Sequence, residues 1–205
     1  MFSIPFFATS LLVILVPGTG VIYTVSTGIA LGKRAGIVAA LGCALGIVPH
    51  LAASILGLSA FLQMGSAAFR FLKLAGAAYL AYLAWSMWRS TGSLGFDGVP
   101  AERSGTAIVV RAVLINVLNP KLTLFFFAFL PQFLSPGAAS PFGEMLSLGA
   151  MFMAMTAAVF MGYGLLAASV RSLIVERPRV VRNVNRSFAG LLAIFALRLA
   201  VASDE

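Results

Sequence analysis

Lys121 is the residue with the most pointed chemistry, because its ammonium group lies within an otherwise apolar segment. A charge among apolar residues is costly, so it either pairs with another group or marks a functional site. The Lys121 ammonium could bind a carboxylate or exchange a proton. The alternative is structural, since a lysine near a helix end can extend its ammonium to a polar surface.

His50, Asn116 and Asn119 are further polar residues inside apolar runs. His50 is the only histidine and can titrate near neutral pH. A lone buried histidine can equally well act only as a hydrogen-bonding group. Asn116 and Asn119 are three residues apart, so they share a face if the helix extends that far.

Two prolines interrupt the apolar segments that carry these residues, in Val16-Pro17-Gly18-Thr19 and in Asn119-Pro120-Lys121. Proline removes a backbone donor and clashes with the carbonyl four residues earlier, leaving groups that lipid cannot satisfy. A half-helix that begins after such a break would direct its N–H groups at a carboxylate, and the freed carbonyls could face an ammonium. The alternative is that Pro17 and Pro120 only kink packed helices.

The composition indicates that membrane helices must position these residues. The chain is 60% hydrophobic and 10% charged, against about 25% charged in soluble domains, and its mean hydropathy is +1.02. Because a span needs about 20 apolar residues, we searched for runs without charge. The predicted spans are 3–27, 37–62, 69–89, 109–134, 145–170 and 187–202.

Basic residues concentrate in the loops after the first, third and fifth predicted spans. These residues are Lys33, Arg34, Arg89, Arg103, Arg111, Arg171, Arg177, Arg179, Arg182 and Arg186, whereas the loops after the second and fourth spans hold Arg70 and Lys73. Cytoplasmic loops carry such an excess, so both termini are predicted to lie outside. This topology explains the net charge of +8 better than a nucleic-acid partner does.

The two halves of the chain show related patterns. A shift of 103 residues places Pro17 on Pro120 and moves the second predicted span largely onto the fifth. With three spans in each half, the halves must have opposite orientations. We therefore predict an all-α polytopic membrane protein of about six helices, as two inverted three-helix repeats with broken helices 1 and 4.

Broken helices at matching positions of two repeats are typical of secondary transporters. Residues 1–205 are predicted to form a single transmembrane domain, because the spans consume most of the chain. Its parts are a first repeat at about 1–90, a cytoplasmic linker at about 91–108 and a second repeat at about 109–202.

Several kinds of site are not expected. The acidic residues are all predicted in loops or the tail, so no carboxylate pair is available for catalysis or metal binding within the membrane; they are Asp97, Glu102, Glu144, Glu176, Asp204 and Glu205. Cys43 is the only cysteine, which leaves no internal disulfide. No nucleotide-binding motif is present, so we expect no enzyme and no cofactor, and an ion gradient would have to drive transport.

Three stretches of the sequence resemble the LysE/RhtB type of bacterial amino-acid exporters, in the lysine and homoserine/threonine exporter superfamily. They are residues 15–50, 71–90 and 109–136, in the order of that family. The resemblance implies six hydrophobic segments and proton-driven export of amino acids or closely related metabolites. The family commonly has Pro-Gly-Pro where this chain has Pro17-Gly18-Thr19, which implies a looser turn and a different substrate.

The resemblance marks Pro17, Gly18, Asn119, Pro120 and Lys121 as the central site. The full set of predicted substrate-binding residues is Pro17, Gly18, Thr19, Tyr23, Asn116, Asn119, Pro120 and Lys121, and His50 and Lys121 are the candidates for proton coupling. No residue is predicted to be catalytic or to bind a metal.

The predicted function is a secondary active exporter or antiporter of amino acids in the bacterial inner membrane. The alternative is a non-transporting membrane assembly or sensing subunit, which would tolerate Lys121→Ala or Asn119→Ala. Glycines recur at four-residue spacing, and such glycines serve internal packing and dimer contacts equally well, so a homodimer stays open. These glycines are Gly28, Gly32, Gly36, Gly42 and Gly46.

Overall fold

The computed structural model describes residues 2–57, 104–135 and 137–169 continuously, and single residues at intervals between 71 and 89 and between 183 and 197. The elements in the continuously described ranges are all helical. The predicted third and sixth spans, and most of the predicted linker, lie outside those ranges. The count of six spans and the inverted repeat therefore stay predictions.

The first predicted span consists of two half-helices, α1 (Ile4–Leu15) and α2 (Thr19–Leu31), with a bend of 55° between them. The Ser3 hydroxyl caps the start of α1 by accepting from the Phe6 N–H. Pro17 follows the end of α1 and has no N–H with which to continue it. The proline break predicted from the sequence is therefore present as a broken helix.

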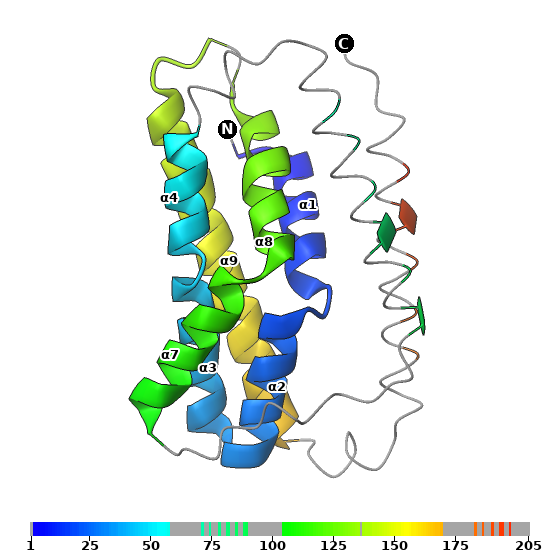
Figure 1. The fold of residues 1–205 in the computed structure, drawn as a ribbon, viewed down its shortest axis with the longest axis vertical. Coiled ribbons are helices and arrows are strands. Elements are labelled where there is room, and N and C mark those ends of the chain that lie inside the picture. The colour runs from blue at the N-terminus through cyan, green and yellow to red at the C-terminus, as the bar shows by residue number, and fades with distance from the viewer. Residues whose placement is uncertain are drawn as a thin grey trace.

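The fourth predicted span is broken in the same way. Its half-helices are α7 (Gly105–Val117) and α8 (Pro120–Leu124), and the bend, measured on to Phe133, is 52°. After α8 the chain continues through a π-helical stretch (Phe125–Phe129) and a 3-10 turn (Leu130–Phe133). Figure 1 shows that the pair α1 and α2 and the pair α7 and α8 run in opposite directions, with both breaks midway along the bundle.

Two further spans are continuous. The helices α3 (Lys33–Leu45) and α4 (Val48–Leu56) together form one apolar span, and α9 (Pro141–Ser169) forms another. Counting each bent pair as one span, the described residues hold up to four helices able to cross a membrane.

Some helices begin earlier than the search for uncharged runs predicted. Lys33 and Arg34 lie in the first turn of α3, where they were predicted to lie in a loop. Glu144 likewise lies in the first turn of α9, where its carboxylate accepts from the Ser135 N–H at 2.8 Å. A carboxylate is favourable at a helix N-terminus, so a charge near the membrane surface does not mark a helix end.

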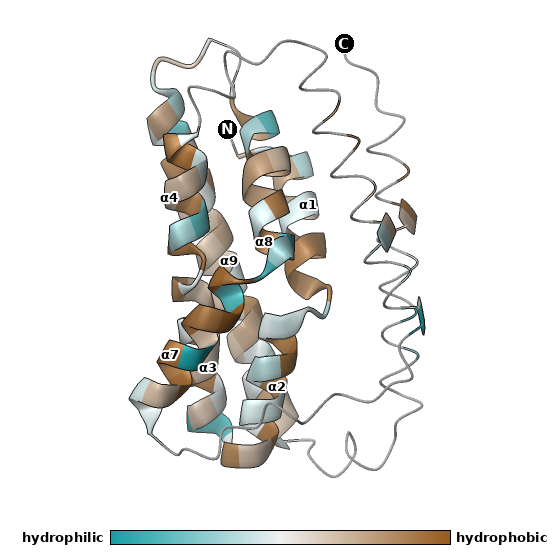
Figure 2. Ribbon diagram, viewed as in Figure 1, coloured by the Kyte–Doolittle hydropathy of each residue, from teal (hydrophilic) through white to brown (hydrophobic). Residues whose placement is uncertain are grey.

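Glycines allow the helices of the described bundle to pack closely. A Cβ atom on Gly28 would lie 2.6 Å from the Gly164 carbonyl oxygen, and one on Gly42 would lie 2.7 Å from the Ala112 Cβ. These glycines serve internal packing between α2, α3, α7 and α9. Figure 2 shows largely hydrophobic helices with hydrophilic colour around the break between α7 and α8.

Candidate functional site

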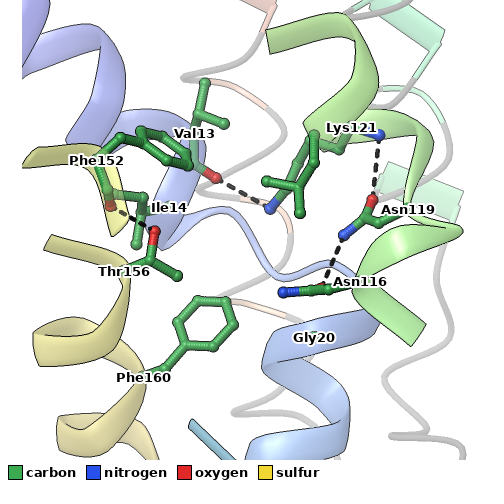
Figure 3. Close-up of a pocket in the computed structure, with 10 residues that line it drawn as sticks. Val13, Ile14, Gly20, Asn116, Asn119, Lys121, Phe152, Thr156 and Phe160 are labelled. Atoms are coloured by element: carbon green, nitrogen blue, oxygen red, sulfur yellow. Dashed lines mark hydrogen bonds between the residues drawn. The ribbon is translucent and has the colours of Figure 1, made fainter. Parts of the chain in front are cut away.

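Lys121 joins the two broken helices. It is buried at the start of α8, and its Nζ atom donates to the carbonyl oxygens of Val13 and Val16, both at 3.0 Å. Figure 3 shows the side chain reaching from α8 to the end of α1. In an unbroken helix the Val13 carbonyl would accept from the N–H of residue 17, and Pro17 has none. The Lys121 ammonium therefore satisfies the carbonyl that the first break frees.

Within the described residues, one donor of the Lys121 ammonium is unused. A lysine has three N–H bonds, and two of them are occupied by Val13 and Val16. A Cβ atom on Gly18 would lie 3.3 Å from the Nζ atom, so this glycine leaves room for the ammonium beside the backbone.

Asn116 connects the second break to its neighbours. Its Nδ2 atom donates to the Cys43 carbonyl of α3 at 2.6 Å, and its Oδ1 atom accepts a longer bond of 3.4 Å from Asn119 Nδ2. A Cβ atom on Gly20 would lie only 2.6 Å from that Oδ1 atom. The Asn116 amide is therefore fixed between α3, α8 and the first turn of α2.

Asn119 stabilises the second break from within. Its Oδ1 atom accepts from the Lys121 backbone N–H at 3.1 Å, which caps α8. The Asn119 backbone N–H donates to the Asn116 carbonyl at 3.0 Å. Both sides of this break therefore find partners among residues of the break itself.

His50 also contacts the second break. Its Nε2 atom lies 2.9 Å from the Asn116 carbonyl oxygen, and its Nδ1 atom lies 3.4 Å from the Thr123 hydroxyl. Since a carbonyl can only accept, Nε2 carries the hydrogen and Nδ1 is the acceptor. The imidazole ring therefore joins α4 to both the second break and α8.

A small cavity lies between the two breaks and α9. Its volume is about 10 Å³, which is room for about one water molecule. The lining is polar at Gly20, Asn116, Asn119, Lys121 and Thr156 and apolar at Val13, Ile14, Leu122, Phe152 and Phe160. Figure 3 shows polar side chains at the break between α7 and α8 facing apolar side chains of α1 and α9. Such a cavity suits a ligand with a charged end and an apolar side chain.

The predicted substrate residues divide into two groups. Asn116, Asn119 and Lys121 line the cavity, and Gly18 lies beside the Lys121 ammonium. The other four do not line it: Pro17, Thr19, Tyr23 and Pro120. Their role in binding stays a prediction.

Several lining residues were not among those predicted. Val13 could have been found, because it lies four residues before Pro17 and loses its backbone donor there. Phe152, Thr156 and Phe160 recur at four-residue spacing on α9, which places them on one helical face. That spacing occurs on every face of a long apolar helix, so it could not single out this one.

The first turn of α2 is a further polar feature of the site. No side chain caps this helix at Gly18, whereas the amide of Asn119 caps α8. The N–H groups of a helix start carry partial positive charge. The first break therefore offers backbone donors beside Gly20, on the wall of the cavity.

The chain is similar to several known membrane proteins. The family model described as LysE type translocator matches residues 11–203. A homoserine/homoserine lactone efflux protein of Salmonella typhimurium is 31% identical, covering 95% of this chain and 93% of the relative. A leucine efflux protein of Klebsiella pneumoniae is 28% identical, covering 92% and 89%. A membrane protein of Vibrio cholerae is 31% identical, covering 95% and 94%. No solved structure matches the chain.

Proposed function

The chain belongs to the LysE family of translocators, and from this premise we propose that it exports neutral amino acids across the bacterial inner membrane. The relatives named for efflux of homoserine and leucine support an amino-acid substrate. Export is driven by the proton gradient, and both termini lie outside the cytoplasm. The protein acts as a transporter and not as an enzyme.

The main structural support for this proposal is the position of the Lys121 ammonium in the cavity. Its third N–H is available to a substrate carboxylate, in a site shielded from water where a charged hydrogen bond is strong. The N–H groups at the start of α2 add positive potential at the same wall. An amino acid therefore binds with its carboxylate between Lys121 and the first turn of α2.

The ammonium of the substrate faces Asn116. The Asn116 Oδ1 atom accepts only one long hydrogen bond within the described residues, and it lies on the Gly20 side of the cavity. It can accept from an ammonium without losing the Asn116 bond to Cys43. Both charged ends of a zwitterion thus have partners in the same cavity.

The substrate side chain lies against Val13, Ile14, Phe152 and Phe160. These residues offer no carboxylate, so a second positive charge on the substrate would meet Lys121 without compensation. A neutral side chain avoids that repulsion and gains from apolar burial. The site therefore favours amino acids such as homoserine or leucine over lysine.

The central cavity must open to admit an amino acid. A volume of about 10 Å³ holds no more than about one water molecule, so the central cavity is closed in this conformation. Half-helix α1 ends at the first break, and half-helix α8 begins at the second. Rotation at Pro17 and Asn119 would therefore separate Lys121 from α1. Alternating access then moves half-helices about a fixed site.

The proposal is tested by efflux from cells loaded with dipeptides of homoserine, leucine, threonine and lysine. Cells expressing the protein should release one or more neutral amino acids faster than empty cells, Lys121→Ala should remove that gain, and Asn119→Ala should reduce it. Lys33→Ala is the matched control, because it removes the same charge at the start of α3, away from the cavity. Efflux of lysine alone would contradict the substrate class. An absence of any efflux would favour the non-transporting alternative.

A further inference from the structure

A second cavity lies where α2, α3 and α7 meet, separate from the central site. Its volume is about 460 Å³, within the range of small-molecule pockets. Its lining includes Leu31 at the end of α2, Arg34 of α3, and Gly105 and Ile108 of α7. This end of the bundle carries the basic turn between α2 and α3, which the positive-inside rule assigns to the cytoplasm.

One face of α2 connects this cavity to the central one. Gly20 lines the central cavity and Leu31 lines the second, and the helix between them is about 16 Å long at its usual rise. Tyr23 and Thr27 lie between these two positions, three and seven residues after Gly20, and therefore on the same helical face.

A matching face of α7 runs beside it. Asn116 lines the central cavity and Ile108 lines the second, with Ala112 between them at four-residue spacing. Ala112 is fully buried and presents only a methyl group. The Ala112 methyl group lies against Gly42 of α3, so this face of α7 packs on α3 and adds little bulk beside α2.

Tyr23 crosses the seam between α2 and α7. The side chain is buried, and its hydroxyl donates to the Ile108 carbonyl oxygen at 3.1 Å. Thr27 lies one turn closer to the second cavity, and its fully buried hydroxyl lies beside the Tyr23 hydroxyl without the geometry of a hydrogen bond to any described residue. A buried hydroxyl without a partner is unfavourable, so the Thr27 hydroxyl can bond to a polar group that enters between the helices.

We infer that the second cavity is the cytoplasmic vestibule for the exported amino acid, and that the Tyr23 bond to Ile108 closes the route from it to the central site. The inference rests on the proposed function, since it takes the ligand to be an amino acid. Arg34 attracts the substrate carboxylate in the vestibule. The Thr27 hydroxyl then bonds to the substrate once Tyr23 has released the Ile108 carbonyl.

The route is tested by cysteine labelling in a Cys43→Ala background, which has no other thiol. The reporters are Thr27→Cys, on the vestibule side of Tyr23, and Thr156→Cys, in the central cavity. An impermeant thiol reagent is applied to either face of membrane vesicles. With Tyr23 intact, the Thr27→Cys reporter should react from the cytoplasmic face faster than the Thr156→Cys reporter. Equal rates, or faster labelling at position 27 from the opposite face, would overturn the inference.

Tyr23→Phe removes the hydroxyl and keeps the ring. Loss of one neutral hydrogen bond should raise the labelling rate of the Thr156→Cys reporter from the cytoplasmic face about fivefold, with little change for the Thr27→Cys reporter. An unchanged rate at position 156 would show that the bond to Ile108 is no barrier.

Tyr163→Phe is the matched control. The Tyr163 hydroxyl donates to the Leu15 carbonyl at the same distance of 3.1 Å, but from α9 to the end of α1. Its loss should leave labelling of the Thr156→Cys reporter unchanged. If Tyr163→Phe accelerates labelling and Tyr23→Phe does not, the route follows another seam and the inference is wrong. Labelling requires no transport. The labelling test can therefore contradict the route while the efflux assay supports amino-acid export, and the labelling test can support the route while the efflux assay contradicts export.

Discussion

The two proline breaks bend the chain by nearly the same angle, 55° and 52°, yet they satisfy their backbone groups differently. At the second break Asn119 caps α8 and its N–H donates to Asn116, so the partners lie within the break. At the first break the freed carbonyls of α1 bond to Lys121 of α8, and the start of α2 has no side-chain cap. Each break therefore takes a donor from the other half of the molecule, since His50 also donates to the Asn116 carbonyl, but only the second break has an internal side-chain cap as well.

This difference suggests a division of roles. Backbone groups that bond within their own break keep the geometry of that break fixed. Backbone groups that bond to the Lys121 side chain can bond to a ligand instead when that side chain moves away. The second break acts as the fixed frame that positions Asn116 and Lys121, and the first break supplies the backbone groups that substrate can reach. Substitutions at the two breaks should therefore differ in their effect on export.

Gly20→Ala should nearly abolish export, because the added methyl group of α2 would clash with the Asn116 amide of the second break. The added Cβ atom would lie 2.6 Å from Asn116 Oδ1, and Asn116 cannot move without losing its 2.6 Å bond to Cys43. Overpacking of this kind costs about 1–3 kcal/mol, and at the upper end export should fall about 100-fold. The measurements are initial efflux rates and Tm in detergent.

Gly18→Ala is the matched control for that variant. Its Cβ atom would lie 3.3 Å from Lys121 Nζ, the far end of a flexible side chain that can shift slightly. The Gly18 backbone is extended, with φ of −120°, so alanine adds no strain. Export should stay within about twofold of wild type. Equal losses in both variants would mean that the two breaks are equally adaptable, against the division of roles.

Asn119→Ala should have an intermediate effect, because it removes the cap of the second break. Loss of an N-cap costs about 1 kcal/mol, so we expect export to fall about fivefold and Tm to decrease. Asn119→Ser keeps a capping oxygen but loses the 3.4 Å bond to Asn116, and it should export nearly as well as wild type. If serine is as harmful as alanine, Asn119 acts through Asn116 or the substrate and not through the cap.

The sequence predicted the position of each break, but it did not predict the distant residues that each break contacts. Pro17 and Pro120 act on their own backbone, so the interruptions follow from local chemistry alone. The bond from Lys121 to Val13 joins residues 108 positions apart, and that from Tyr23 to Ile108 spans 85 positions. No local pattern encodes such pairs, since they depend on how the half-helices pack. Tyr23 was therefore assigned to the site by its type, although it lies at the seam between α2 and α7.

His50→Gln should change the coupling of export and leave the fixed frame in place. A glutamine amide can replace the Nε2 donor to the Asn116 carbonyl, which His50 meets at 2.9 Å, but it cannot take up a proton. We expect basal efflux within about threefold of wild type and loss of the stimulation by an imposed pH gradient. The measurement is efflux with and without a protonophore. A variant that still responds to the gradient would remove His50 from the coupling mechanism.

Thr19→Pro should have the smallest effect on export. It tests whether the backbone of the first break needs the conformational freedom that threonine allows. Thr19 is the first residue of α2, a position that proline favours. The preceding Gly18 already has the extended conformation that proline requires of its neighbour. The substitution should therefore stabilise the protein by about 0.4–1 kcal/mol, seen as a higher Tm, and export should fall no more than about twofold, because the Gly20 and Val21 N–H groups of the first turn remain. Val21→Pro is the contrasting control, since it lies further inside the first turn and is buried. If Thr19→Pro instead slows export more strongly, the backbone of the first break must change conformation during transport. Rotation at Pro17 would then require backbone freedom at Thr19.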